Sequence, residues 1–245
     1  MRQLDKLTVQ IFADGADLDG MLALYRNPLI KGFTTNPTLM RKAGIADYPE
    51  FARAVLAAIP DRPISFEVFA DEFDQMGVQA MEIASWGGTV NVKIPVTNTR
   101  GESSAPLVRR LAKAGVSLNV TAMMTLRQVE VIAPCLEAAP PSYISVFAGR
   151  MADTGRDPVP MMAEAVRILG DFPNVRLIWA SPRELLNIFQ ADAIGCHVIT
   201  VTHDVLNKLP LIGHDLDEYS LETVKMFFND AQSAGFRLCE MVPHF

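Results

Sequence analysis

The sequence predicts an α/β fold, a single (β/α)₈ TIM barrel, for two reasons. The first is its length of 245 residues, which is close to the roughly 250 residues typical of such barrels. The second is the alternation of short β-branched runs with longer helix-like segments, which is typical of parallel βα units. No linker, charge block or low-complexity stretch divides the chain. We therefore expect residues 1–245 to form one barrel domain, with a C-terminal helical extension over about 205–245.

Eight runs have the length and residue types of strands, and eight βα units close a barrel where five or six form an open sheet. The expected strands cover residues 8–13, 30–35, 64–69, 90–94, 116–120, 143–147, 175–179 and 197–201. The expected helices cover 18–26, 48–59, 73–85, 105–114, 126–136, 160–169 and 182–191. A last amphipathic helix is expected over 221–234, where Val224, Phe227 and Phe228 need a partner surface on the same barrel or on a neighbouring subunit.

Composition narrows the class of protein. The formal net charge of −6 argues against nucleic acid as a partner, because nucleic-acid binding relies on basic patches. The sequence contains no stretch of about 18 apolar residues, so we expect no membrane span. The N-terminus lacks the apolar run of a signal peptide. Cys135, Cys196 and Cys239 show no C-x-x-C spacing, so we expect neither a disulfide framework nor a zinc site. We expect a cytoplasmic protein with reduced thiols and no metal or cofactor.

Polar side chains occur in phase with the barrel interior, near the C-terminal ends of the strands. Successive strand residues face opposite sides, and the apolar residues of V-N-V-K-I suit the outer helices, which leaves Asn91 and Lys93 facing inward. The same alternation places a further set inside: Asp14, Thr34, Asn36, Ser65, Glu67, Asn119, Thr121, Ser145 and Phe147. This end of a barrel is where such enzymes keep their active sites. The alternative explanations for Lys93 are a buried ion pair and a misplaced strand.

A lysine inside a barrel permits Schiff-base chemistry. An ordinary lysine has a pKa of about 10.4 and is protonated at neutral pH, whereas burial between apolar walls favours the nucleophilic free amine. The amine condenses with a ketone, and the imine stabilises the carbanion that remains when the neighbouring C–C bond breaks. Asp14 and Glu67 are the candidate proton shuttles. We expect Thr121 to hold the released water, and Asn36 and Ser145 to orient substrate hydroxyls.

An anion site is expected beside this centre. The sixth strand leads into A-G-R-M-A-D-T-G-R, which offers Arg150 and Arg156. The seventh leads into W-A-S-P-R-E, where we expect Ser181 to cap a helix that starts with Pro182, with Arg183 beside it. A helix N-terminus favours an anion, and the loops after strands seven and eight often bind phosphate in such barrels.

These residues resemble the transaldolase family, including its short fructose-6-phosphate aldolase-like branch. The resemblance covers about residues 9–204, and its most specific motifs are G-F-T-T-N-P-T-L at 32–39 and N-V-K-I-P-V-T at 91–97. It implies that Lys93 is the Schiff-base lysine, Asp14 the general acid/base, and that Glu67 and Thr121 manage the catalytic water. It further implies sugar phosphate substrates and a homo-oligomer. The residues it places against the substrate are Thr34, Asn36, Asn119, Ser145, Phe147, Arg150, Ser181 and Arg183.

The resemblance also indicates whether the ketone unit is transferred to an acceptor aldehyde or released as a free ketone. Glu67 stands where the aldolase-like branch often has glutamine, and Phe147 where it often has tyrosine. A phenol at that site could protonate the carbanion and release the ketone, whereas phenylalanine leaves the intermediate to an acceptor aldehyde. We therefore expect transfer of a three-carbon dihydroxyacetone unit from a ketose phosphate to an aldehyde.

Other functions stay open at this point. The first is a lyase that releases a free small ketone. The second is a specialised transferase for a sulfonated, deoxy or long-chain sugar, which the short stretch after Ser181 motivates. The third is a non-catalytic barrel. His197 and His203 would share one strand face, but no cluster of further imidazoles accompanies them, so a metal-dependent aldolase is not expected.

Overall fold

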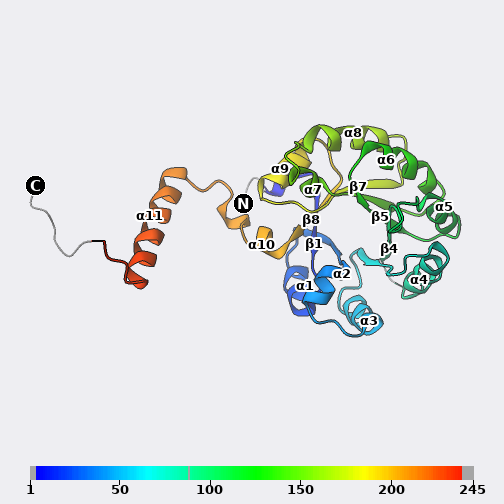
Figure 1. The fold of residues 1–245 in the computed structure, drawn as a ribbon, viewed down its shortest axis with the longest axis horizontal. Coiled ribbons are helices and arrows are strands. Elements are labelled where there is room, and N and C mark those ends of the chain that lie inside the picture. The colour runs from blue at the N-terminus through cyan, green and yellow to red at the C-terminus, as the bar shows by residue number, and fades with distance from the viewer. Residues whose placement is uncertain (1–3, 88, 239–245) are drawn as a thin grey trace, which may run out of the picture.

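Eight parallel strands form a closed barrel in sequence order (Figure 1) in the computed structural model, which describes residues 4–87 and 89–238. Each strand pairs with the next, and β8 pairs with β1. The predicted α/β TIM barrel is therefore confirmed. The strands are β1 (Gln10–Asp14), β2 (Ile30–Thr34), β3 (Ile64–Glu67), β4 (Val90–Pro95), β5 (Leu118–Met123), β6 (Ser142–Val146), β7 (Val175–Trp179) and β8 (Val198–Thr202).

Helices surround the barrel and join successive strands (Figure 1). They are α1 (Leu18–Tyr25), α2 (Pro37–Lys42), α3 (Tyr48–Ala58), α4 (Phe73–Ser85), α5 (Ala105–Lys113), α6 (Leu126–Ile132), α7 (Ala148–Ala152), α8 (Val159–Leu169), α9 (Leu186–Ala193), α10 (His203–Leu206) and α11 (Leu216–Ser233). Short 3₁₀ turns occur at Leu4–Lys6, Ala133–Leu136 and Leu209–Leu211. The short helices α2, α7 and α10 add to those that the sequence predicts.

The predicted boundaries of the fifth strand and of the helix that follows it differ from the structure. The fifth strand begins at Leu118 and not at residue 116, because the N–H of Val116 still donates to the Leu111 carbonyl at 3.1 Å. Gly115 makes this helix ending possible with a φ of 79°, a conformation that glycine adopts without steric cost. The helix expected over 126–136 changes to a 3₁₀ turn at Ala133, next to Pro134, whose nitrogen has no proton to donate.

The barrel has an apolar layer inside and a larger apolar layer between strands and helices. The inner layer includes Phe12, whose ring meets Tyr143 edge to face at 5.8 Å between centroids. Gly32 makes room for it, because a Cβ there would lie 2.7 Å from the Phe12 ring. The apolar layer fills the lower part of the barrel, so the polar inward residues gather at the C-terminal ends of the strands.

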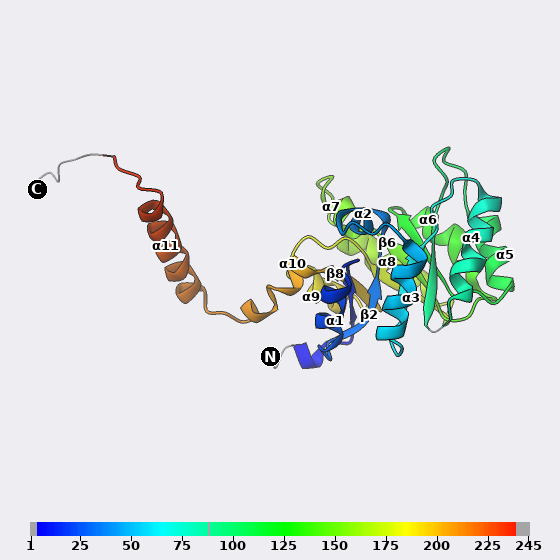
Figure 2. The same ribbon diagram turned by 90° about the horizontal axis from the view of Figure 1, so that it is seen from below.

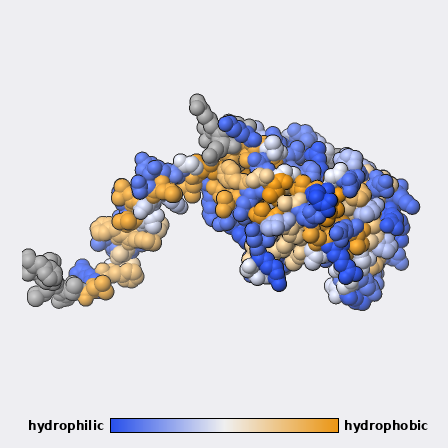
Figure 3. All heavy atoms as spheres, turned by 90° about the horizontal axis from the view of Figure 1, so that it is seen from above, coloured by the Kyte–Doolittle hydropathy of each residue, from blue (hydrophilic) through white to orange (hydrophobic). Residues whose placement is uncertain are grey.

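The helix α11 leaves the barrel as an arm (Figures 1 and 2). It begins at Leu216 and not at residue 221, because Asp215 caps it by accepting hydrogen bonds from the N–H groups of Asp217 and Glu218. Apolar side chains line the arm (Figure 3), and Val224 and Phe228 are 60% and 62% exposed. Residues 239–245 of the expected extension lie outside the described residues, as does Cys239. No helix in the described part is long and apolar enough to cross a membrane.

Candidate active site

Lys93 lies inside the barrel near the end of β4, as the alternation of the strand predicts. The residue is only 5% exposed. Its Nζ donates to the backbone carbonyl of Thr35 at 2.7 Å and lies 2.9 Å from Glu67 Oε2. The strand register places Glu67 directly beside Lys93. The buried amine is therefore held between one carboxylate and one carbonyl, so the buried ion pair that the sequence left open is present.

Asp14 ends β1 and carries the second carboxylate of the site. It accepts a hydrogen bond from Thr34 Oγ1 at 2.8 Å and a longer one from Asn36 Nδ2 at 3.4 Å. Burial raises the pKa of Asp14 above its ordinary value of 3.8, and the charge of Lys93 and the Thr34 hydrogen bond oppose that rise without cancelling it. A carboxyl group with a raised pKa is suited to give and take protons nearer neutral pH.

Asn119 connects the third and sixth strands through the barrel interior. Its Nδ2 donates to Ser65 Oγ at 3.0 Å, and its Oδ1 accepts from Ser145 Oγ at 2.7 Å. The register places Asn119 beside Lys93. This chain of hydrogen bonds fixes the amide orientation and presents hydroxyl and amide groups close to the lysine strand.

Thr121 has a buried hydroxyl that finds no hydrogen-bond partner among the described residues. A buried polar group without a partner is unfavourable, and one beside a reactive centre is suited to bind water or substrate. The next residue, Ala122, has a φ of 64° and sits where the β5–β6 register shifts. Such left-handed conformations in residues other than glycine concentrate at functional sites.

Phe147 and Arg150 follow β6 at the rim of the barrel. Phe147 packs against the inner apolar layer that includes Phe12 and Tyr143. The guanidinium of Arg150, in the short helix α7, lies over the Phe147 ring at 5.4 Å from its centroid. The phenylalanine therefore orients a cation at the mouth of the site.

Comparisons with known proteins identify the family of the chain. The model of the transaldolase/fructose-6-phosphate aldolase family matches residues 11–244. The chain belongs to the transaldolase/fructose-6-phosphate aldolase family. A probable transaldolase of Dehalococcoides mccartyi is 32% identical over 202 residues, covering 82% of this chain and 90% of that protein. A probable transaldolase of a Thermoanaerobacter species is 30% identical over 231 residues, covering 94% of this chain and 100% of that protein.

Solved structures resemble the chain in fold. The crystal structure of dihydrodipicolinate synthase from Rhodopseudomonas palustris has a TM-score of 0.58 at 13% sequence identity, covering 79% of this chain and 69% of that one. At this identity the likeness concerns the barrel alone. The family assignment therefore depends on the sequence matches.

In this family member, the helix expected to begin at Pro182 begins at Leu186, so Ser181 does not cap it. Ser181 has a φ of 60°, and the Asn187 side chain accepts hydrogen bonds from the N–H groups of Arg183 and Glu184. These contacts hold the segment after β7 as a turn. The predicted anion site at a helix N-terminus is thus wrong in its local structure, although Ser181 and Arg183 still follow β7.

The loops after β6 and β7 touch at Gly149. A Cβ there would lie 1.5 Å from the Ser181 carbonyl oxygen, so only glycine allows this approach. Arg183 reaches the same region from the other loop, where Nε donates to Asp153 Oδ1 at 3.0 Å and Nη2 pairs with Oδ2. Arg156 donates to Thr154 Oγ1 at 2.7 Å and is exposed. The segment that carries Ser181 and Arg183 therefore lies against α7. Arg183 is already paired with the Asp153 carboxylate.

A cavity of about 500 Å³ opens beside the ends of β3 and β4. Its lining includes Pro37, Ala70, Asp71, Pro95, Thr97 and Asn98. Arg100, which follows the lining residue Thr99, pairs with Glu72 at 2.6 Å and Glu102 at 3.0 Å. The cavity lies at the C-terminal end of the barrel, beside the segments that follow β3 and β4.

The two histidines do not share a strand face, contrary to the expectation. His203 begins α10 after β8 has ended, and Nδ1 of His197, which precedes β8, accepts a hydrogen bond from the Leu177 N–H at 3.1 Å. Within the described ranges, no three His, Cys, Asp or Glu side chains are arranged to hold a metal ion.

Three residues of the site were missed from the sequence. Thr200 lies 2.5 Å from the Thr34 hydroxyl, and the alternation in V-I-T-V-T carried a signal for it. The backbone carbonyl of Thr35 contacts Lys93, and the Tyr48 hydroxyl contacts the backbone of Glu67. Neither contact has a sequence signal, because both depend on how separate segments pack.

The raised pKa of Asp14 predicts a pH-dependent effect of Asp14→Asn on stability. Ionising Asp14 costs more in the folded than in the unfolded state, so its contribution to the free energy of unfolding falls as pH rises from 3.8 through the folded-state pKa. The asparagine of the variant cannot ionise. We expect the free energy of unfolding of Asp14→Asn, minus that of the parent, to increase between pH 4 and pH 8 in guanidinium titrations.

Asp71→Asn is the control, since hydrogen bonds from Thr99 lower the pKa of Asp71 below 3.8. Its ionised form stabilises the fold, and that contribution is lost as pH falls through the folded-state pKa. The corresponding difference for Asp71→Asn should stay nearly constant between pH 4 and pH 8, because both the unfolded-state and the folded-state pKa of Asp71 lie below this interval. A flat or falling difference for Asp14→Asn would show that the pKa of Asp14 is not raised in the folded protein.

Proposed function

We propose that this chain transfers a dihydroxyacetone unit from a ketose phosphate to an acceptor aldehyde through a Schiff base on Lys93. The observation that supports it best is the placement of Lys93, a buried amine 2.9 Å from the Glu67 carboxylate inside a barrel of the transaldolase family. Burying an ion pair seldom increases the free energy of unfolding, because desolvation offsets the attraction between the charges. A purely stabilising role is therefore a poor explanation for a buried Lys93.

In the proposed reaction, Glu67 takes a proton from the Lys93 ammonium, and the free amine attacks the ketose carbonyl. Glu67 returns that proton to the hydroxyl of the addition product, which leaves as water while the protonated imine forms, and the unpartnered Thr121 hydroxyl binds this water. The ionised Asp14 then removes a proton from a substrate hydroxyl. This hydroxyl is on the carbon that will become the carbonyl carbon of the departing aldehyde. That C–C bond breaks, its electron pair moves into the imine, and an aldehyde departs.

The reverse addition completes the transfer. The acceptor aldehyde adds to the carbon nucleophile, and Asp14, now protonated, returns its proton to the new alkoxide. Water then hydrolyses the imine and frees Lys93. The raised pKa of Asp14 suits this alternation, because its two protonation states are closer in free energy near neutral pH than those of an ordinary aspartate.

The network around Asn119 is proposed to orient the hydroxyls of the transferred unit. Asn119, Ser145 and Asn36 present amide and hydroxyl groups around the lysine strand. Thr34 holds Asp14 in place by donating to its Oδ1. These contacts position the substrate carbonyl near the amine, which is where much of the rate enhancement of such enzymes originates.

The phosphate of the substrate is proposed to bind at Arg150, Ser181 and Arg183. Arg150 lies at the rim over Phe147. Arg183 would have to exchange its carboxylate partner, Asp153, for the phosphate. Because the loops that carry them meet at Gly149, the two cations would reach one phosphate from adjacent strands.

The proposed chemistry uses only groups of the chain itself, so we propose no metal or cofactor. Sugar phosphates carry charges that keep them from crossing membranes, and a cytoplasmic location follows from this substrate class.

Trapping tests the Schiff base. Borohydride added with fructose 6-phosphate should reduce the imine and leave a stable adduct on the peptide that contains Lys93, identified by mass spectrometry. Lys93→Met should abolish the adduct and lower turnover by about 1,000-fold or more, because the covalent route is lost. Lys113→Met, at the exposed end of α5, is the control and should behave as the parent. An adduct elsewhere, or none with any ketose phosphate, would exclude the proposal.

Transfer and release are separated by measuring free dihydroxyacetone with and without erythrose 4-phosphate. We expect the parent to release little, because Phe147 has no proton to give the carbanion. Phe147→Tyr should raise release without acceptor by about 10-fold or more, since a general acid typically contributes at least that much. Phe236→Tyr adds a hydroxyl to an exposed ring beyond α11 and should have no effect. Equal release by the parent with and without acceptor would favour the lyase.

We further propose that the chain is a homo-oligomer in which α11 packs on a second copy. Leu221, Val224 and Phe228 form one exposed apolar face of the helix. Most of the stability of a helix in a protein comes from packing of its apolar face, and the segment before α11 carries the helix away from its own barrel (Figures 1 and 2). A second copy is the partner that is always present at the concentration of the chain itself.

Native mass spectrometry measures this directly. The parent should be oligomeric at micromolar concentration, and Val224→Ser/Phe228→Ser should shift it to the monomer, because the apolar face is lost. Asn229→Ala on the same helix should leave the mass unchanged. A monomeric parent would contradict the proposal.

A further inference from the structure

The hydrogen-bond ladder between β2 and β3 stops one step before Glu67. Phe33 N–H donates to the Pro63 carbonyl at 2.8 Å, and Thr35 N–H donates to the Ser65 carbonyl at 3.1 Å. A parallel ladder continues by alternating donors and acceptors. The next two bonds would join the Glu67 N–H to the Thr35 carbonyl, and the N–H of residue 37 to the Glu67 carbonyl.

Neither of these two bonds forms. Residue 37 is a proline, which has no N–H to donate to Glu67. The Thr35 carbonyl accepts from Lys93 Nζ instead, at 2.7 Å. The main chain of Glu67 therefore loses both of its ladder partners on β2 at the residue whose carboxylate meets Lys93.

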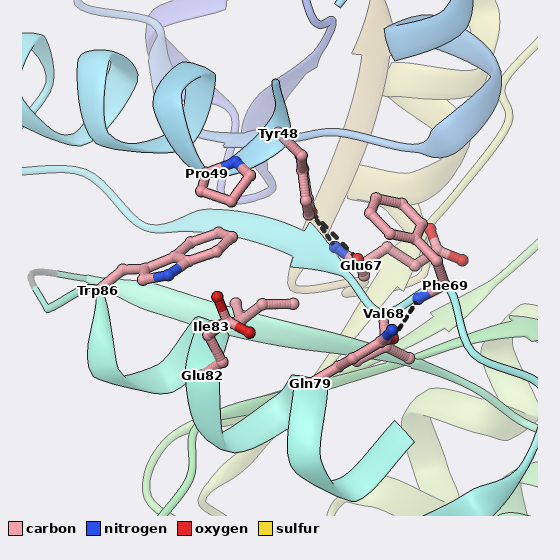
Figure 4. Close-up of a pocket in the computed structure, with 9 residues that line it drawn as sticks. All are labelled: Tyr48, Pro49, Glu67, Val68, Phe69, Gln79, Glu82, Ile83 and Trp86. Atoms are coloured by element: carbon pink, nitrogen blue, oxygen red, sulfur yellow. Dashed lines mark hydrogen bonds between the residues drawn. The ribbon is translucent and has the colours of Figure 1, made fainter. Parts of the chain in front are cut away.

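The Tyr48 hydroxyl replaces both partners. It accepts from the Glu67 N–H at 2.8 Å and donates to the Glu67 carbonyl at 3.1 Å (Figure 4). Burial raises the pKa of Tyr48 far above 10.0, so the hydroxyl remains protonated and keeps both bonds across the physiological range. A single phenol thus satisfies a strand end that the neighbouring strand leaves open.

Tyr48 itself is held by aromatic packing outside the barrel. It is the first residue of α3, after the cap Asp47. Its ring meets Phe69 at 4.6 Å and Trp86 at 5.5 Å between centroids. These rings line a cavity of about 200 Å³ between α3 and α4 (Figure 4). The position of the hydroxyl is therefore set by α3 and α4, independently of the residues that face the barrel interior.

We propose that Tyr48 is a positioning residue that keeps the β2–β3 ladder open beside Lys93. Its hydroxyl bonds to both the N–H and the carbonyl of Glu67. This leaves the Thr35 carbonyl free for Lys93 Nζ and holds the Glu67 side chain against the amine. Without the hydroxyl, the Glu67 N–H competes with Lys93 for the Thr35 carbonyl. The catalytic consequence rests on the proposed Schiff-base function, whereas the effect on Lys93 itself does not.

The test compares Tyr48→Phe with two controls. Tyr25→Phe removes a hydroxyl that bonds to exposed Asp61 at 2.7 Å, far from the site. Leu169→Ala loosens the core beneath α8 and leaves the surroundings of Tyr48 intact. The reactivity of Lys93 toward acetic anhydride is measured against pH by peptide mass spectrometry. Trapping of fructose 6-phosphate by borohydride is measured in parallel.

We expect Tyr48→Phe to move the pH profile of Lys93 acetylation and to slow trapping by about 10- to 100-fold, the loss typical of a misplaced catalytic group. Its ketose KM should change little, because the substrate-binding groups stay in place. Both controls should keep the parent's profile. A merely structural tyrosine would make Tyr48→Phe behave like Leu169→Ala, with a lower melting temperature and an unchanged acetylation profile, which would overturn the proposal.

The two proposals fail in different ways. If the parent is never trapped but Tyr48→Phe still moves the acetylation profile, the Schiff-base function is wrong and the positioning role stands. If the parent is trapped and the profile of Tyr48→Phe matches that of the parent, the positioning role is wrong. Should Tyr48→Phe not fold, 3,5-difluorotyrosine at residue 48 keeps the ring and makes the phenol ionise at lower pH. The Lys93 profile should then change as that phenol loses its proton, and an unchanged profile would overturn the role.

Discussion

The burial of one amine, that of Lys93, is the constraint around which the site is organised. A buried ammonium needs compensation, and the chain supplies it from two neighbouring strands, through the Glu67 carboxylate and the Thr35 carbonyl. Because those two groups come from β3 and from the end of β2, they can reach Nζ only if the barrel closes in this register. Glu67, Thr35 and Lys93 thus form one unit. The positive charge of Lys93 in this unit also acts on Asp14, at the end of β1, where it opposes the rise of the Asp14 pKa.

The lower part of the barrel allows this polar layer to exist. Phe12 and Tyr143 fill the interior beneath it, and Gly32 gives the Phe12 ring its space. The apolar floor removes water from one side of the site, which strengthens the electrostatic interactions above it. It also explains why a glycine, a residue that weakens strands, stands in the middle of β2. Packing and chemistry are therefore coupled through the same strands.

At the rim, the charge balance differs from that of the centre. Arg183 is paired with Asp153 and exposed to solvent, so the pair is easily exchanged for a stronger anion. Arg150 is oriented by an aromatic ring at the mouth. At the centre, Lys93, Asp14 and Asn119 are each held by hydrogen bonds from neighbouring strands, whereas the rim can rearrange around a substrate. This division suits the proposed transfer at one fixed amine.

The barrel, the inward direction of Lys93, Glu67, Asp14 and Asn119, and the family were determined by the sequence alone, because strand alternation and residue type are local properties. The start of α9 at Leu186 and the start of β5 at Leu118 were decided by tertiary contacts and caps, such as Asn187 accepting from Arg183. The role of Tyr48 was also invisible, since nothing in D-Y-P-E indicates that a phenol will complete another strand's hydrogen bonds. Side-chain facing follows from periodicity along one segment, whereas the replacement of ladder bonds depends on where three separate segments meet in space.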